Sequence, residues 1–158
     1  MIYLTGMMGS GKSELGSAAA RILGLPFYST DDMAEQMAGM TISEMFERHG
    51  EEYFRDIESE ILLKVSRMPA GIVSTGGGIV LRERNRALMS STGKVLWLHR
   101  DIAQTAATLD PAGRPLLKNG TDALFSIYEQ RLPLYRMADA EFTGSTAEQL
   151  SETIAALL

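Results

Sequence analysis

The sequence predicts an α/β fold, in which helices cover both faces of a five-stranded parallel sheet in a three-layer α/β/α arrangement. Two observations predict it: short apolar runs alternate with helical patterns, and no repeat or linker divides the 158 residues. Strands separated by helices form parallel sheets that are covered on both faces. Ligands gather at the carboxyl ends of such strands. We therefore expect a single domain over 1–158, whose site is formed by four segments: Gly6–Ser13, Ser29–Asp32, Gly76–Gly78 and Asp110–Gly120.

The first half of the chain contains three of the predicted strands, at 2–5, 25–28 and 72–74. Gly24 is the expected end of a first helix, because glycine readily adopts the backbone conformation that ends helices. Residues 31–67 have helical patterns, and Thr41–Glu44 matches a capping box. The apolar spacing predicts that these helices bury Leu15, Ala18, Ala19, Ile22 and Leu23 in the first, and Phe54, Ile57, Ile61 and Val65 in a later one.

The second half contains a predicted strand at 94–98 and an edge strand at 141–143. Proline and glycine between them predict a loop over 110–120. The last helix is expected to begin near Ser145, with Glu148 completing a capping box. Its spacing predicts that it buries Leu150, Ile154 and Leu157.

Composition excludes several classes of protein. There is no cysteine, which excludes disulfides and thiolate sites. The formal net charge is −5 and there is no basic run, which argues against nucleic acid as a partner. No apolar run long enough for a membrane span and no signal-peptide pattern is present, so we expect no membrane partner and a cytoplasmic location. Of the 15 cationic residues 11 are arginine, which suits recognition of carboxylates and phosphates.

The strongest motif is Gly6–Ser13, which satisfies G-x-x-x-x-G-K-[ST] without mismatch. At ordinary glycine usage, a random chain of this length would match in roughly 1% of cases or fewer. The motif also follows a predicted strand and opens a predicted helix. In such loops backbone N–H groups surround phosphate oxygens, so Lys12 is expected to bridge the β- and γ-phosphates and Ser13 to bind Mg²⁺.

Two acids, Asp31 and Asp32, follow the second predicted strand. A kinase that acts on a hydroxyl needs a carboxylate that orients the attacking oxygen and can deprotonate it. The alternative is that one of them only caps the next helix. Their position alone favours neither interpretation.

Three arginines and a glycine run complete the candidate site. Arg55 has Glu51 and Glu58 one turn away, so a solvated ion-pair face is the alternative to a binding role. Arg114 lies in the long loop, where a mobile cation could close over phosphates, and Arg131 is expected at a helix end. Either could also be an ordinary surface arginine. Gly76–Gly78 indicates a ligand that approaches the backbone closely.

Together these segments resemble the shikimate kinase family over essentially the whole chain. Any one of the later motifs is weak, but their order and spacing are specific. The resemblance is carried by Gly6–Ser13, Phe27–Glu35, Gly50–Arg55 with Glu58, Gly76–Gly78, Arg114–Leu117 and Arg131–Tyr135.

The resemblance implies a P-loop kinase fold of the nucleoside monophosphate kinase type, with an acceptor-binding segment at about 31–60 and a lid at about 110–122. It implies transfer of the ATP γ-phosphate to the 3-hydroxyl of shikimate in aromatic amino acid biosynthesis, with Mg²⁺, by a protein that is often monomeric. The implied catalytic residues are Lys12, Asp31 and Arg114. The implied binding residues are Gly9, Ser10, Gly11, Lys12, Ser13, Glu14 and Arg114 for ATP, Ser13 for the metal, and Asp31, Arg55, Gly76, Gly77, Gly78 and Arg131 for shikimate.

The chain departs from the family at two places. Ser29 stands where relatives usually have an aspartate that helps to hold Mg²⁺, so we expect weaker metal affinity with the chemistry retained. Ala107 and Thr108 stand where many relatives have an arginine near adenine, and the region around Gly144 is expected to line the adenine pocket.

Two other functions remain open from the sequence. One is a gluconate-type or nucleotide kinase of the same fold, although a nucleotide acceptor would require more cations. The other is a non-catalytic relative that binds nucleotide or a protein partner, for which Ser29 is the main support.

Overall fold

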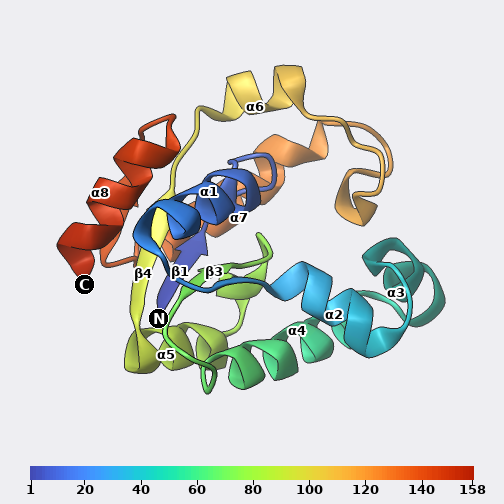
Figure 1. Ribbon diagram of the computed structural model, residues 1–158. Helices are drawn as coiled ribbons and strands as arrows, with labels where there is room; N and C mark the ends of the chain where they lie inside the picture. The colour runs from blue at the N-terminus through green and yellow to red at the C-terminus, as the bar shows by residue number, and fades with distance from the viewer.

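In the computed structural model, which describes residues 1–158, five parallel strands form one sheet in the order β2-β3-β1-β4-β5 (Figure 1). The central strand β1 pairs with β3 on one side and with β4 on the other. The strands are β1 Ile2–Thr5, β2 Phe27–Ser29, β3 Ile72–Ser74, β4 Lys94–Leu98 and β5 Ala140–Phe142. The helices are α1 Lys12–Leu23, α2 Thr30–Ala38, α3 Ile42–His49, α4 Glu51–Val65, α5 Glu83–Thr92, α6 Ile102–Thr108, α7 Ala123–Tyr135 and α8 Ala147–Leu157, with 3₁₀ turns at Ile79–Leu81 and Pro115–Leu117.

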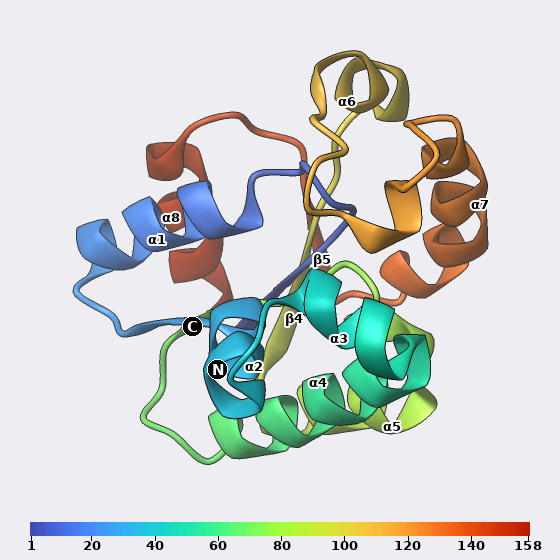
Figure 2. The same cartoon turned by 90° about the vertical axis from the view of Figure 1, so that its right-hand side faces the viewer.

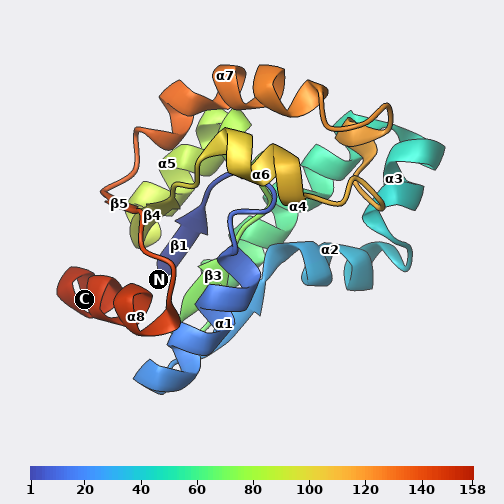
Figure 3. The same cartoon turned by 90° about the horizontal axis from the view of Figure 1, so that it is seen from above.

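Helices cover both faces of the sheet, as Figure 3 shows from above. On one face α1 and α8 pack against alternate strand residues such as Leu4 and Leu96. On the other face α4, α5 and α7 surround Tyr3, Val73 and Trp97. Because successive strand residues point to opposite faces, the buried strands have apolar residues on both faces. The predicted three-layer architecture is confirmed.

A third, smaller core lies beside the sheet, where α2, α3 and α4 pack on one another (Figure 2). Its fully buried residues are Ala34, Met45, Phe54 and Ile61. The loop between α6 and α7 faces this unit, and Ser43 Oγ donates a hydrogen bond to the carbonyl oxygen of Gly113 at 3.3 Å. The predicted acceptor segment and the predicted lid therefore contact each other.

Most of the helix ends, caps and strands predicted from local sequence patterns are present in the structure. Gly24 ends α1 with φ 65°, and Thr41 and Glu44 form the predicted capping box at α3. The observed strands β1, β3 and β4 have the predicted bounds, 2–5, 72–74 and 94–98. Strand β5 lies at an edge of the sheet, as expected.

Some boundaries are wrong by one or two residues. Strand β2 begins at Phe27 rather than Leu25, and β5 is 140–142 rather than 141–143. The cap of α8 is Thr146 with Gln149, not Ser145 with Glu148. The two candidate boxes are offset by one residue, and sequence alone does not distinguish them. The predicted 110–120 loop contains a short 3₁₀ turn.

The buried face of α1 also differs from the prediction. Ile22 is 52% exposed, and the fully buried side of the helix is formed by small residues at 16, 19 and 20. An ideal Cβ on Gly16 would lie 2.6 Å from a methyl group of Leu4. The helix therefore lies so close to the sheet that small residues, rather than the large apolar ones, face it. In α4 and α8, Ile57 and Leu157 are only partly buried, while the other predicted core residues are fully buried.

None of the helices combines the length and apolar character needed to cross a membrane.

Candidate active site

The predicted phosphate loop connects β1 to α1 at the carboxyl edge of the sheet. Gly9 and Gly11 have φ values of 78° and 85°, which other residues rarely adopt. The loop runs directly into the first turn of α1. Backbone N–H groups and the positive end of a helix dipole therefore face the same place.

Lys12 holds this loop together. Its ammonium group donates hydrogen bonds to the carbonyl oxygens of Gly6 at 2.7 Å and Met7 at 2.8 Å, and to Ser10 Oγ at 3.3 Å. Burial lowers the pKa of Lys12 to about 8, an effect that the nearby Asp31 carboxylate opposes. The ammonium is thus already positioned in the loop that is expected to bind phosphate.

Ser13, the next residue, contacts a side chain that sequence reasoning missed. Its Oγ lies 2.9 Å from the Oγ of Ser74, the last residue of β3 and 61 positions further along the chain. The only sequence signal was that Ser74 ends a predicted strand beside the predicted site.

Asp31 lies in the first turn of α2, after β2. The N-cap of α2 is Ser29, whose Oγ accepts a hydrogen bond from the backbone N–H of Asp32. The alternative that Asp31 or Asp32 serves as the cap is therefore wrong. Burial raises the pKa of the Asp31 carboxyl, and Lys12 opposes this shift. Asp32 is exposed.

Arg55 and Glu58 form a buried ion pair on α4. They are 6% and 1% exposed, and Arg55 Nη1 donates to both carboxylate oxygens of Glu58, at 2.9 and 3.2 Å. Glu51 adds an ion pair of 3.2 Å from the exposed side. The predicted alternative of a solvated ion-pair face is therefore wrong. Burial raises the pKa of Glu58 to about 7, against the opposing effect of Arg55.

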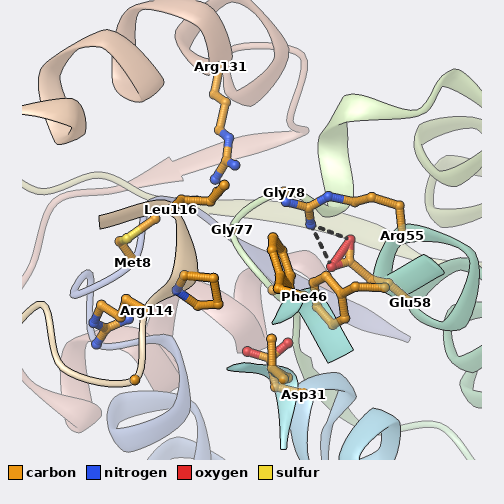
Figure 4. A pocket seen from close by; sticks show the side chains of 15 residues that line it. Met8, Asp31, Phe46, Arg55, Glu58, Gly77, Gly78, Arg114, Leu116 and Arg131 are labelled. Atoms are coloured by element: carbon orange, nitrogen blue, oxygen red, sulfur yellow. Dashed lines mark hydrogen bonds and ion pairs between the residues drawn. The ribbon is translucent and has the colours of Figure 1, made fainter. Parts of the chain in front are cut away.

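Arg131 lies within α7, which continues through Pro133 to Tyr135, and not at a helix end as expected. Its side chain is 4% exposed, yet it forms no ion pair, and no dashed line reaches it in Figure 4. A buried cation without a carboxylate partner is costly. Because it borders a cavity, an anionic ligand is the natural counter-charge.

Arg114 lies in the loop between α6 and α7. Its Nε donates a hydrogen bond to the carbonyl oxygen of Asp110 at 3.2 Å, which leaves the terminal nitrogens without a partner. The guanidinium group borders both the phosphate loop and the cavity beside it.

The glycine run after β3 is in contact with other side chains of the site. It consists of Gly76, Gly77 and Gly78. A Cβ on Gly76 would lie 2.9 Å from Asp31 Oδ1 and 3.0 Å from Glu58 Oε2, and one on Gly77 would lie 3.2 Å from Arg131 Nη1. A Cβ on Gly78 would overlap the Arg55 guanidinium group. Tyr135 donates a hydrogen bond of 2.6 Å to the Gly77 carbonyl and so holds the run in place.

These groups enclose a cavity of about 130 Å³ (Figure 4). Ligand pockets for drug-sized molecules measure about 300–1,000 Å³, so this cavity suits a small ligand. In the figure Arg131 and Arg55 approach the glycine run from α7 and α4, and Asp31 points into the cavity from α2. The apolar part of the wall consists of Met8, Ile42, Phe46, Phe54, Pro115 and Leu116, of which Ile42 and Phe46 lie outside the sequence motifs that predict the site.

The region expected to contact adenine has one feature that sequence reasoning missed. Arg100, after β4, donates a hydrogen bond to the carbonyl oxygen of Gly144 and lies over the ring of Phe142. Ala107 and Thr108 are at the end of α6. Leu109 and Thr105 contact Gly9, so α6 packs on the phosphate loop.

The family model and the most similar curated proteins point to one family. Residues 8–158 match the family described as "Shikimate kinase". The shikimate kinase of Synechococcus sp. (strain RCC307) is 42% identical to this chain, over 97% of this chain and 81% of its own length. The shikimate kinase of Clostridium botulinum is 36% identical, over 94% of this chain and 91% of its own length. A solved structure of shikimate kinase from Acinetobacter baumannii in complex with shikimate superposes with a TM-score of 0.91, covering 99% of this chain and 90% of the other at 33% identity.

Proposed function

This chain belongs to the shikimate kinase family, and we propose that the residues lining its cavity transfer the γ-phosphate of ATP to the 3-hydroxyl of shikimate. The family's members are ATP-dependent kinases that phosphorylate shikimate. The observation that carries the proposal is the buried guanidinium group of Arg131, which forms no ion pair and lies beside the Arg55–Glu58 pair.

The acceptor carboxylate binds between Arg55 and Arg131. Charge-assisted hydrogen bonds of this kind contribute about 1.5–3 kcal/mol each. Glu58 keeps the Arg55 guanidinium group against Gly78, and the backbone of Gly76–Gly78 offers close contacts to a small ligand. A neutral polyol would leave Arg131 without a counter-charge, so the site favours a polyol that bears a carboxylate.

Asp31 holds the hydroxyl that reacts. Its carboxylate lies in the wall of the cavity and also borders the phosphate loop, so it faces both reactants. The raised pKa makes the carboxylate a stronger base than an exposed aspartate. Asp31 orients the attacking oxygen and accepts its proton as the new O–P bond forms, while the bond from the γ-phosphorus to the bridging oxygen breaks and ADP leaves.

The phosphate loop binds the ATP tail. The backbone N–H groups of residues 9–14, which include Gly9, Ser10, Gly11 and Glu14, surround the phosphates. Lys12 supplies a fixed positive charge. Arg114 comes from the lid at about 110–122, which touches the acceptor-binding segment at about 31–60 through Ser43. Its guanidinium group offsets the charge that develops on the transferred group, and the lid excludes water.

The hydroxyl oxygen of Ser13, at the start of α1, is a suitable ligand for Mg²⁺. This ion binds through one or two protein oxygens together with phosphate oxygens, and Ser13 Oγ is such a donor beside the loop. Bound there, the ion would neutralise charge on the phosphates. Ser13 is therefore the proposed protein ligand.

A coupled assay of ADP release with MgATP tests the assignment. We expect turnover with shikimate and none with gluconate. Arg131→Ala should raise the KM for shikimate by about 10- to 150-fold, the equivalent of one charge-assisted contact, and leave the KM for ATP unchanged.

Arg136→Ala is the matched control, because Arg136 is the C-cap residue of the same helix but is exposed. It should behave as the wild type. If Arg131→Ala phosphorylates shikimate with unchanged KM, carboxylate recognition by this pair is wrong. Turnover with gluconate but not shikimate would point to another kinase of the same fold.

A further inference from the structure

Three serine hydroxyls line the boundary between α1 and the sheet, next to the phosphate loop. Ser74 at the end of β3 is the register partner of both Leu4 on β1 and Ser29 on β2. Ile72 and Phe27, two residues earlier on their strands, pack in the core beneath α1. Since side chains alternate along a strand, Ser74 and Ser29 lie on the α1 face, the face on which Ser13 stands.

Ser74 is the partner of the Ser13 hydroxyl. Their oxygens are 2.9 Å apart, Ser74 is 4% exposed, and neither hydroxyl forms another hydrogen bond. A hydroxyl that ligates a cation uses an oxygen lone pair, so its proton must be donated elsewhere. The Ser74 oxygen is the acceptor within reach of that proton.

In P-loop enzymes generally, Mg²⁺ is held by the Ser or Thr of the loop together with an aspartate from a second motif. Here β3, one of the two strands beside β1, has the sequence Ile72-Val73-Ser74 and contains no acid. Its contact with the loop serine is made by a neutral hydroxyl. Groups that orient a metal ligand without touching the metal commonly change metal affinity by about 10- to 100-fold when they are removed.

We propose that Ser74 is a positioning residue for the metal that accompanies the nucleotide: it accepts the Ser13 proton and thereby directs a lone pair of Ser13 Oγ towards the cation. The inference rests on the proposed function in so far as that function assigns Ser13 to the metal. It adds a residue to which neither the motif nor the family comparison assigned a role. The two side chains that meet at this point, Ser13 and Ser74, are both neutral hydroxyls.

The test measures metal binding without turnover. The affinity of the enzyme–ADP complex for Mn²⁺ is followed by the electron paramagnetic resonance signal of free Mn²⁺, and the affinity for ADP alone is measured in EDTA. Ser74→Ala should weaken Mn²⁺ binding about tenfold and leave metal-free ADP binding unchanged. Ser74→Thr, which keeps the hydroxyl, should restore most of the loss.

Ser151→Ala is the control, because Ser151 is similarly buried but lies on α8. It should leave both affinities unchanged. The proposal is overturned if Ser74→Ala binds Mn²⁺ as the wild type does, if it loses metal-free ADP binding to the same degree, or if Ser74→Thr fails to restore the loss in a folded protein.

These outcomes are separable from failure of the proposed function, because neither measurement contains shikimate. A wild-type protein that binds Mn²⁺ and ADP as described but does not phosphorylate shikimate would refute the substrate and leave Ser74 in its role.

Discussion

Asp31 and Glu58 both approach Gly76, but only one of them is free to act on an acceptor. Glu58 is bound through both oxygens to Arg55, whereas Asp31 forms no ion pair and borders both the cavity and the phosphate loop. Burial raises the pKa of both carboxyls. The difference in partners, and not the residue type, is why we propose Asp31 as the base and Glu58 as a support for Arg55.

Replacing Asp31 by asparagine should therefore affect the chemical step. Positioned acid–base groups contribute about 10²- to 10⁴-fold to rates, so we expect Asp31→Asn to lower kcat at least about 100-fold. The amide can still hold a hydroxyl, so the KM for shikimate should change much less. Steady-state kinetics with shikimate and MgATP provide both constants.

Asp32→Asn is the matched control, since the neighbouring Asp32 is exposed. Its kcat should equal that of the wild type. A kcat within threefold of the wild type for Asp31→Asn would show that another group accepts the proton.

At the scale of elements, the glycine run after β3 is shaped by side chains that three helices bring to it. Asp31 comes from α2, Arg55 and Glu58 from α4, and Arg131 from α7. Arg55 and Glu58 are three residues apart, so they lie on the same face of α4. The run is glycine because the acids and arginines fill the space where side chains would stand.

Gly78→Ala tests this packing. Gly78 has φ −92°, which alanine adopts without strain, so the only expected effect is the overlap with Arg55. The displaced guanidinium group should raise the KM for shikimate about tenfold or more, while ATP binding stays unchanged.

A double-mutant cycle with Arg55→Ala identifies the cause. If the new methyl group acts through Arg55, Gly78→Ala should add little to the effect of Arg55→Ala, because the two residues are in contact. Full additivity of the two effects would mean that the methyl group disturbs something else.

At the scale of the whole molecule, the buried Glu58 links global stability to pH. Its folded pKa of about 7 lies above the reference value of 4.5. Arg55 and Arg131 oppose this shift, and Asp31 adds to it. Between these two pH values the folded protein keeps a proton that the unfolded chain releases, so a rise in pH favours unfolding.

Urea unfolding of the wild type and of Glu58→Gln at a series of pH values measures this linkage. From pH 4.5 to 7 the free energy of unfolding of the wild type should fall, relative to that of the variant, by at most about 3 kcal/mol. Glu60→Gln, at an exposed position of the same helix, should follow the wild type. A difference between wild type and Glu58→Gln that does not change with pH would place the folded pKa of Glu58 at its ordinary value.

Much of the architecture could be predicted from the sequence because its signals are local. The phosphate loop, the Gly24 end of α1 and the capping box at Thr41 each depend on residues within one or two turns. The buried strands appear as short apolar runs between helical patterns. The prediction failed where two local signals competed, as at the cap of α8, and where packing distance mattered, as on the buried face of α1.

The site was predicted as a set of residues but not as a set of interactions. For Asp31 the sequence favoured neither a catalytic carboxylate nor a helix cap. For Arg55 it left a solvated ion-pair face as the alternative to a binding role. The structure buries Arg55 against Glu58, leaves Arg131 without a counter-charge and gives the capping role to Ser29. Phe46 and Arg100 carried no recognisable sequence signal, and Ser74 only that it ends a predicted strand beside the site.

The sequence by itself determined the strand–helix order, the phosphate loop and the succession of motifs that identifies the family, since backbone conformation and motif spacing are properties of neighbouring residues. Only the tertiary structure decided which charges are buried, which are paired and which face the cavity. Those properties depend on contacts between distant segments, such as Ser13 with Ser74, and folding alone brings them together.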